Sequence, residues 1–150
     1  MNRYERSMEI HKKGYNCCQC VLLAFSDLTG LDEQTAMNIS AGYGSGTGTG
    51  ELCGAITGAV MTLGLLTPVD QSNPVASKQR TTALSKELQR RFKEKFEAVR
   101  CQDLLAKAAG FQVDDRAPAA KAMGLTKHCD VMIVTAIEIV EQMLAEREAQ

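Results

Sequence analysis

Apolar residues recur every three or four positions along most of this 150-residue chain, which is the spacing of one face of an α-helix. No stretch alternates apolar and polar residues as a half-buried strand would. Seven helices are expected, over residues 4–13, 17–28, 32–39, 51–66, 74–96, 101–109 and 127–148. Residues 111–125, which include Pro118 and Gly124, are expected to be irregular. The sequence therefore predicts an all-α fold, an irregular multi-helix bundle.

Residues that cap helices stand at several of these boundaries. Asn16 precedes the second helix, where its side-chain oxygen can accept hydrogen bonds from free amide groups, and Asp32 opens the third helix. Pro74 suits a first helical turn, and Gly30 suits a helix C-terminus. No linker or internal repeat interrupts the pattern, and a chain of this length buries enough surface to fold as one domain. We therefore expect a single domain over residues 1–150.

Charge and hydropathy argue against several classes of partner. The 17 Lys and Arg residues nearly balance the 18 Asp and Glu residues, so no strong field favours nucleic acid or an anionic membrane. The basic run 86–95 also contains Glu87 and Glu94 and is interpreted as a solvated helix face. Residues 131–140, the most apolar stretch, are too few to span a bilayer. Residues 1–13 are charged and lack a signal-peptide core, so we expect a cytoplasmic protein.

Six cysteines are the residues best suited to carry chemistry: Cys17, Cys18, Cys20, Cys53, Cys101 and Cys129. In a reducing compartment, cysteines are more often metal ligands or reactive thiols than structural disulfides. In the expected helices, four of them fall in the first turn of four different helices, namely Cys17, Cys53, Cys101 and Cys129. The free N–H groups and the positive end of the helix dipole there favour a thiolate.

Electrostatics limits what converging sulfurs can do. The helix dipole contributes about 0.3–1 kcal/mol, which is less than one pKa unit. Two thiolates about 4 Å apart would repel each other by about 4 kcal/mol at an effective dielectric constant of 20. Because the repulsion exceeds the dipole effect, converging sulfurs must keep their protons, form disulfides or bind a cation. Redox pairing and metal binding are therefore the two leading hypotheses.

The segments around these cysteines resemble the C-GCAxxG-C-C family of redox-active proteins. The resemblance rests on YNC at 15–17, ELCGAITG at 51–58, CQDLL at 101–105, and Cys129, and it extends over residues 15–145. It implies that Cys17, Cys53, Cys101 and Cys129 occupy the four cysteine positions of the family. It also implies a redox activity, which would make the chain an oxidoreductase that works with an unidentified redox partner.

Two further cysteines depart from that pattern. Cys18 and Cys20 stand where the family has small residues, and they create the CxxC pair of Cys17 and Cys20 on one helix face. Such a pair suits a dithiol couple or two metal ligands. Alternatively, Cys18 and Cys20 are small buried hydrophobic residues. No βαβ unit is evident, so the pair does not indicate a thioredoxin-like site.

The chain contains two histidines, His11 and His128. His128 adjoins Cys129 and is either a further ligand or proton donor, or simply a residue of the helix-capping region. His11 lies in a charged helix and is expected at the surface.

A glycine-rich stretch, GYGSGTGTG at 42–50, precedes Cys53. It lacks the Lys-Ser/Thr ending of a P-loop and the spacing of GxGxxG, so nucleotide binding is not favoured. The loop offers N–H groups to the sulfurs or to a bound anion, or it is a plain connector. The helix that follows continues the glycine stripe, which suits either close helix packing or room for a bulky group beside Cys53. The candidate cofactor-binding residues are Gly48, Gly50, Gly54 and Gly58.

The leading functional hypothesis is thiol–disulfide exchange or electron transfer through a convergent four-cysteine site. The alternative is an iron–sulfur cluster, zinc or another thiophilic metal held by Cys17, Cys53, Cys101 and Cys129, with Cys20 and His128 as additional ligands. Haem attached through thioethers is not expected, because no CxxCH is present. A third hypothesis is a structural module with buried cysteines, in which the apolar face of residues 131–144 forms either a homodimer interface or part of the core.

Overall fold

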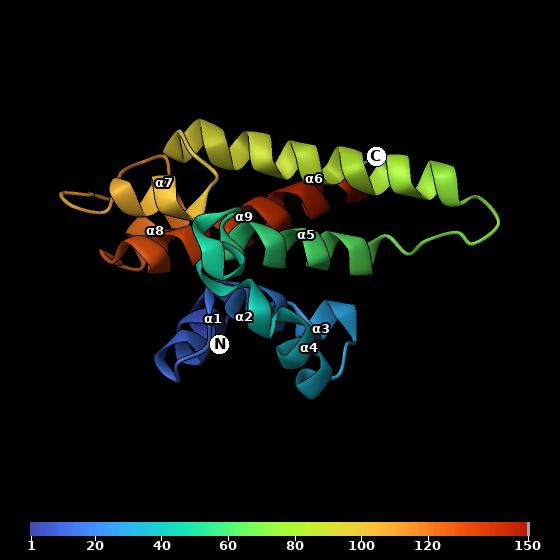
Figure 1. The fold of residues 1–150 in the computed structure, drawn as a ribbon, viewed down its shortest axis with the longest axis horizontal. Helices are drawn as coiled ribbons and strands as arrows, with labels where there is room; N and C mark the ends of the chain where they lie inside the picture. Colours follow the sequence, from blue (N-terminus) through green and yellow to red (C-terminus); the bar gives the residue numbers. More distant parts are fainter. Residues whose placement is uncertain (150) are drawn as a thin grey trace.

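The computed structural model describes residues 1–149, and the all-α prediction is confirmed (Figure 1). The α-helices are α1 (Arg3–Lys12), α2 (Cys17–Ala24), α3 (Ser26–Thr29), α4 (Glu33–Ser40), α5 (Gly54–Leu66), α6 (Pro74–Phe96), α7 (Cys101–Ala106), α8 (Pro118–Ala122) and α9 (His128–Glu148). Between α4 and α5 lie a 3-10 turn, η1 (Ala41–Tyr43), and a π-type turn, η2 (Gly46–Gly50). None of the helices within residues 1–149 has the length and apolar character needed to cross a membrane.

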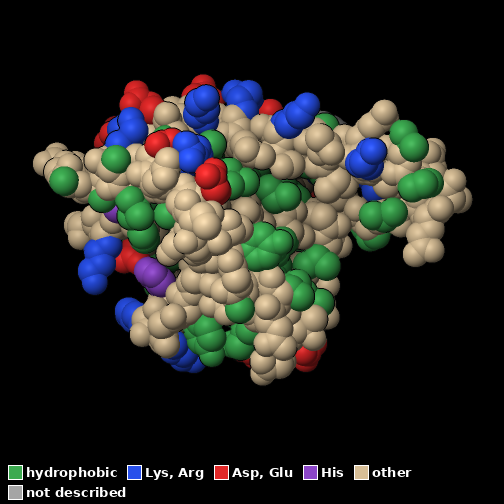
Figure 2. Space-filling view, viewed as in Figure 1, with side chains coloured by type: hydrophobic (Ala, Val, Ile, Leu, Met, Phe, Trp, Pro, Cys, Tyr) green, Lys and Arg blue, Asp and Glu red, His purple; other side chains and the backbone are tan. Residues whose placement is uncertain are grey.

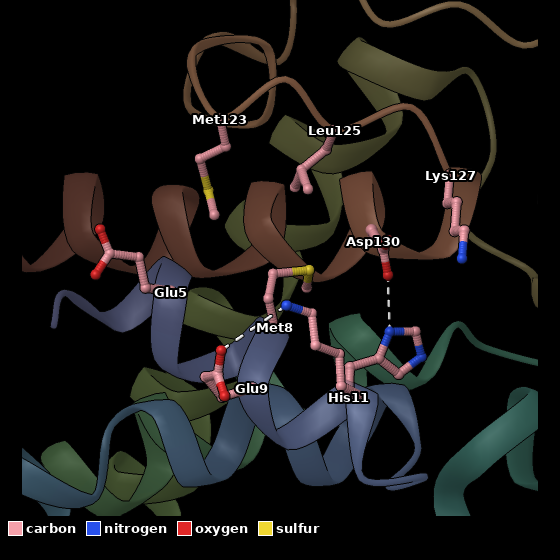
Figure 3. Close-up of a pocket in the computed structure, with 9 residues that line it drawn as sticks. Glu5, Met8, Glu9, His11, Met123, Leu125, Lys127 and Asp130 are labelled. Carbon is pink, nitrogen blue, oxygen red and sulfur yellow. Dashed lines mark hydrogen bonds and ion pairs between the residues drawn. The ribbon is translucent and has the colours of Figure 1, made fainter.

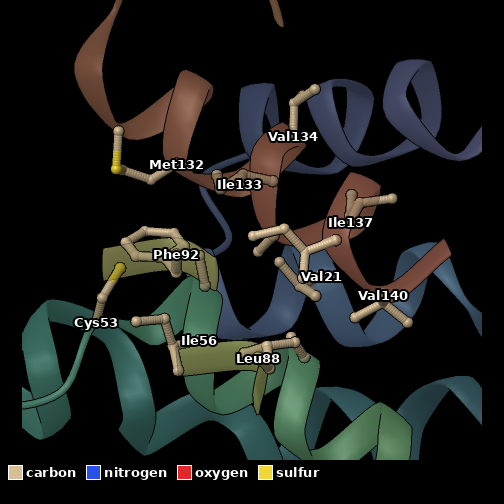
Figure 4. Close-up of a cluster of buried hydrophobic side chains, with 14 of the residues drawn as sticks. Val21, Cys53, Ile56, Leu88, Phe92, Met132, Ile133, Val134, Ile137 and Val140 are labelled. Carbon is tan, nitrogen blue, oxygen red and sulfur yellow. The ribbon is translucent and has the colours of Figure 1, made fainter. Parts of the chain in front are cut away.

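Helix α9 forms the centre of the bundle. It packs against α1, α2, α5, α6 and α8, while α6 runs along one edge of the molecule and α1 to α4 lie on the opposite side (Figure 1). Val131, Val134, Ile137 and Val140 are fully buried among residues of α2, α5 and α6 (Figure 4). The apolar face of α9 is therefore used in the core of one chain, where each such side chain gains about 1.5–3 kcal/mol by leaving water.

Surface charge is concentrated on α6, as the sequence predicts for residues 86–95. Lysine, arginine and acidic side chains alternate along the edge formed by this helix (Figure 2). Arg90 pairs with Glu87 and Glu94 on α6 itself, and Arg91 pairs with Glu146 of α9. Exposed pairs of this kind contribute little to stability, so they describe a solvated face and not a binding patch.

The capping predictions are confirmed. The side-chain oxygen of Asn16 accepts a hydrogen bond from the Gln19 amide (2.9 Å), and Asp32 accepts one from the Thr35 amide (3.0 Å). Pro74 is the first residue of α6, and Gly30 ends α3 in the left-handed conformation. Local side-chain chemistry therefore fixes these helix ends.

The expected helix over residues 17–28 is wrong, because the chain bends at Phe25. The backbone of Phe25 leaves the helical region (φ −101°, ψ 15°), and α3 starts afresh at Ser26. The ring of Phe25 is fully buried, with the Arg3 guanidinium 5.0 Å from its centroid. The bend seats a large aromatic side chain in the core, a tertiary gain that overrides local helix propensity.

The expected helix start at Glu51 is also wrong, because α5 begins at Gly54. Residues 51–53 are extended and pair with residues 99–101 through a single antiparallel bridge between Leu52 and Arg100. The Cys53 amide donates to the Val99 carbonyl (2.9 Å), and the Cys101 amide donates to the Glu51 carbonyl (2.6 Å). These long-range hydrogen bonds satisfy backbone groups of residues 51–53, in place of a first helical turn that would begin at Glu51.

Two boundaries further along the chain also differ from prediction. Helix α7 ends at Ala106 and not at residue 109, and the segment 111–125 contains the short helix α8. Pro118 is the first residue of α8, and the Glu138 carboxylate of α9 accepts a hydrogen bond from the Ala119 amide (3.1 Å). A carboxylate from another helix thus takes the place of a local cap.

Helices α2 and α5 make the most extensive contact in the bundle, and glycine makes it close. A Cβ atom at Gly58 would lie 2.7 Å from the carbonyl oxygen of Cys18 and 3.0 Å from the Cβ of Val21, both on α2. A Cβ at Gly54 would lie 3.3 Å from the Cys17 Cβ. At Gly54 and Gly58 the space beside the glycine stripe is occupied by α2, so these two glycines serve close helix packing.

We predict opposite effects of alanine at two glycines of α5. Gly58→Ala should lower the free energy of unfolding by about 1–3 kcal/mol, because the new methyl group meets the backbone of α2. Gly64→Ala should raise it by about 0.5–1 kcal/mol, because nothing lies within 4 Å of that position and alanine favours the helix. Urea denaturation followed by circular dichroism measures both. Equal effects of the two substitutions would contradict the packing role of Gly58.

Candidate functional site

Cys17, Cys53, Cys101 and Cys129 meet at one small cavity of about 30 Å³. Cys17 begins α2, Cys53 immediately precedes α5, Cys101 begins α7, and Cys129 is the second residue of α9. The cavity is lined by these four cysteines together with Ser45, Gly54, Leu104, Leu105, His128 and Met132. The fold therefore gathers the starts of four helices, and with them four sulfur atoms that are far apart in the sequence.

The bridge between Leu52 and Arg100 positions Cys53 and Cys101. Each cysteine directly follows one of the two bridged residues, and each donates its amide hydrogen across the pair. Arg100 adds an ion pair to Glu51 across the same bridge, with 3.2 Å between Nη2 and Oε1. Two cysteines that are 48 positions apart in the chain are thus held at neighbouring helix starts by backbone hydrogen bonds.

The capping residue Asn16 positions Cys17. Its side chain forms a capping box with Gln19 and also donates a hydrogen bond to the Ala41 carbonyl (3.0 Å). A Cβ atom at Gly44 would lie 2.7 Å from the Asn16 Cβ, so only glycine fits there. The start of α2 is therefore fixed to the turn that leads into the glycine-rich segment.

Cys129 lies at the start of the 21-residue helix α9, which has no side-chain cap. The first amide groups of α9 are therefore available to a nearby anion, and a helix of this length presents a full dipole. The next residue, Asp130, pairs with His11 of α1, with 2.7 Å between Oδ1 and Nδ1 (Figure 3). His11, expected at the surface, is therefore partly buried and ties α1 to the residue beside Cys129.

Cys17 and Cys129 have the strongest effect on each other's pKa in the site. A hydrogen bond from the Cys17 thiol to the Cys129 sulfur lowers the pKa of Cys129 to about 6, and the neighbouring His128 and His11 rings act in the same direction against burial. The same hydrogen bond, together with burial, raises the pKa of Cys17. Cys129 is therefore a thiolate at neutral pH, and Cys17 is the protonated donor that stabilises it.

The other two thiols of the cavity stay protonated. Burial raises the pKa of Cys53 to about 11, even though the amide groups of Ala55 and Ile56 favour its charged form. Burial and the nearby Cys129 raise the pKa of Cys101. The cavity therefore holds one negative charge, as the repulsion between close thiolates requires.

Cys18 and Cys20 lie outside the cavity. Both are fully buried, with the Cys18 sulfur 3.9 Å from the Met61 sulfur and the Cys20 sulfur 3.7 Å from the Tyr15 carbonyl oxygen. Burial raises the pKa of Cys18 to about 11 and that of Cys20 to about 12. The structure therefore places both as small buried residues, and Cys17 and Cys20 do not share a site.

Of the four candidate glycines, Gly54 lines the cavity, whereas Gly48, Gly50 and Gly58 do not. Gly50 packs against Gln102 of α7, and Gly48 has nothing within 4 Å of the position of a Cβ. The loop contributes Ser45 to the cavity, a residue held in the left-handed conformation with φ 53°. The loop therefore closes one side of the site through Ser45, with Gly54 beside it.

The apolar wall was not predicted from the sequence. It consists of Leu104 and Leu105 of α7 and Met132 of α9. Leu104 and Leu105 belong to the CQDLL segment, and Met132 stands one helical turn after His128, so their spacing from the site cysteines was a usable signal. His11 and Asp130 are 119 positions apart, and no sequence pattern links them.

His128 also lines the cavity. Its ring stands edge-on to the ring of Phe111, with 4.9 Å between centroids. Its Nδ1 atom is buried and has no hydrogen-bond partner within residues 1–149. The His128 side chain therefore stands beside the sulfurs, where it helps to lower the pKa of Cys129.

The donor set does not fit a metal ion as it is placed. Among residues 1–149, no group of three or more His, Cys, Asp or Glu side chains is arranged to hold one. All six cysteines are free thiols in this arrangement.

Comparison with known proteins gives one match. Residues 15–143 match the family described as "Putative redox-active protein (C_GCAxxG_C_C)". No protein of curated function and no solved structure is significantly similar to the chain. Because the match spans most of the sequence and all four cysteines of the cavity, the chain belongs to the C-GCAxxG-C-C family of redox-active proteins.

Proposed function

We propose that the protein is a dithiol–disulfide redox protein in which Cys129 is the reactive thiolate and Cys17 is its partner. The observation that carries this proposal is the hydrogen bond between the two sulfurs, with the pKa of Cys129 lowered and that of Cys17 raised. A thiolate at neutral pH is the form of cysteine that attacks an oxidant, and a neighbouring thiol completes the disulfide. The family match supports redox use of these cysteines.

The reaction is a two-electron oxidation. The Cys129 thiolate gives up an electron pair to an oxidant, and the Cys17 thiol then forms the sulfur–sulfur bond and releases its proton. In sum, one thiol and one thiolate become a disulfide, one proton and two electrons that pass to the oxidant. Cys53 and Cys101 line the same cavity, and the new disulfide can pass to them by exchange once one of these thiols has lost its proton.

Metal binding by the same four sulfurs is the competing function. The absence of a preformed group of three or more ligands in residues 1–149 supports the redox proposal over it. We further propose a cytoplasmic location and an oxidoreductase activity with a separate reductant, since six free thiols suit a reducing compartment. A homodimer would need a surface other than the buried face of α9.

The first prediction concerns the pKa of Cys129. In the reduced protein, alkylation of Cys129 by iodoacetamide should reach half its maximal rate near pH 6, because the thiolate forms as the pH rises through that pKa. Cys17→Ala removes the hydrogen bond to the thiolate and should move the half-maximum up by about one to two pH units. Mass spectrometry of the Cys129 peptide measures the rate separately from the other cysteines.

Cys18→Ala is the matched control for Cys17→Ala. It also removes a thiol from the start of α2, but that thiol contacts Met61 and not the cavity, so the half-maximum should stay near pH 6. A half-maximum near 9 in the unaltered protein would remove the basis for assigning Cys129 as the nucleophile.

The second prediction concerns the disulfide itself. Mild oxidation with diamide should consume two thiols per chain, join the Cys17 and Cys129 peptides, and be reversed by dithiothreitol. Cys17→Ala and Cys129→Ala should each abolish this crosslink, whereas Cys20→Ala should retain it because Cys20 lies in the core. Peptide mapping with and without reduction identifies the linked residues.

Metal analysis of protein purified without oxygen distinguishes metal binding from the proposed dithiol–disulfide function. Stoichiometric iron, zinc or copper that is lost in Cys129→Ala would contradict the proposal. So would an oxidised protein that retains all six thiols.

A further inference from the structure

We propose that the oxidising substrate of this site is hydrogen peroxide, a neutral oxidant of two heavy atoms, and that the cavity favours it over bulky peroxides and peptide disulfides. The inference rests on the proposed function and names the substrate class of the same site. It is carried by the size of the cavity and by the uncharged character of its lining.

The size of the cavity sets the first limit. Its volume is about 30 Å³. A cavity needs about 10–15 Å³ by this measure to hold one water molecule, so the space accommodates a molecule of about two or three heavy atoms. Exchange with an external disulfide would require two sulfur atoms and their attached carbons to reach Cys129 along the line of attack. Hydrogen peroxide needs room for two oxygen atoms only.

The packed wall of the cavity prevents it from enlarging to admit a larger molecule. Leu104 and Met132 are each 2% exposed and are held in the packed core, where they cannot move aside without cost. Leu105 is 50% exposed and stands at the rim. Core residues therefore fix the floor of the cavity, and one exposed leucine narrows its entrance.

The lining also discriminates by charge. None of the residues that line the cavity is Lys, Arg, Asp or Glu. A charged peptide such as glutathione disulfide would have to leave water without a compensating ion pair, which costs several kcal/mol per charge. A neutral peroxide carries no such cost.

The catalytic cycle consumes two reactants, hydrogen peroxide as the oxidant and a dithiol as the reductant. The Cys129 thiolate attacks one peroxide oxygen, the O–O bond breaks, and the departing hydroxide takes up a proton to leave as water, so that Cys129 becomes a sulfenic acid. The Cys17 thiol then attacks that sulfur, the S–O bond breaks, and a second water leaves with the thiol proton. A dithiol reductant returns the disulfide to two thiols and is itself oxidised.

The test compares oxidants of different size on the reduced protein at pH 7. Hydrogen peroxide, cumene hydroperoxide and glutathione disulfide are each mixed with it. At each time point the protein is quenched in acid and unfolded, and the remaining Cys129 thiol is then alkylated with N-ethylmaleimide and quantified by mass spectrometry. Each rate is divided by the rate of the same oxidant with free cysteine. Hydrogen peroxide should be favoured over the other two by at least about tenfold.

Variants of two exposed leucines test the role of the entrance. Leu105→Ala opens the rim and should reduce the preference for hydrogen peroxide over cumene hydroperoxide by at least about threefold. Leu28→Ala, at a residue of α3 that is 46% exposed and does not line the cavity, should leave the preference unchanged. Circular dichroism confirms that both variants are folded.

The outcomes separate this inference from the function beneath it. Equal normalised rates for the three oxidants, or the same effect of both leucine variants, would overturn the inference, while a Cys17–Cys129 crosslink formed by diamide would leave the redox function standing. If diamide produces no reversible crosslink, the proposed function itself fails, and the inference fails with it.

Discussion

The close approach of α2 and α5 at Gly54 and Gly58 is the contact on which the cysteine cavity depends. The position of a Cβ at Gly54 lies within van der Waals reach of the Cys17 Cβ, and the position of one at Gly58 overlaps the Cys18 carbonyl. A side chain at either position would move the start of α2 away from the start of α5. The sulfurs of Cys17 and Cys53 would then leave a common cavity, so the glycines secure the geometry that the chemistry requires.

Within that geometry, electrostatics allows one negative charge and the surroundings decide which sulfur carries it. Cys129 is only partly buried, stands at the uncapped start of a long helix and has His128 beside it, whereas Cys53 is buried in the core (Figure 4). Burial penalises a thiolate, and helix amide groups favour one. Cys17 shares the hydrogen bond as donor, so the pair is asymmetric: one sulfur is ready to attack and the other is ready to complete a disulfide.

Much of this arrangement could be predicted from the sequence, because its causes are local. Asn16, Asp32 and Pro74 mark helix starts through side-chain and backbone chemistry within one turn. The bend at Phe25 and the pairing of residues 51–53 with residues 99–101 could not be predicted, since each depends on contacts with distant parts of the chain. The same holds for the size of the cavity, which depends on where residues of α7 and α9 lie around the cysteines and follows from no single residue pattern.

The family motif can be understood as a set of packing requirements around one sulfur. In CGAITG, Cys53 precedes the first residue of α5, Gly54 faces Cys17, Ala55 is fully buried, and Gly58 contacts the backbone of α2. Each small residue faces a neighbour that leaves no space for a larger one, and the cysteine occupies the one position from which the helix amides can reach its sulfur. The motif therefore specifies where α2 lies relative to α5. Through Asn16 and the start of α2, it also specifies where Cys17 meets Cys129.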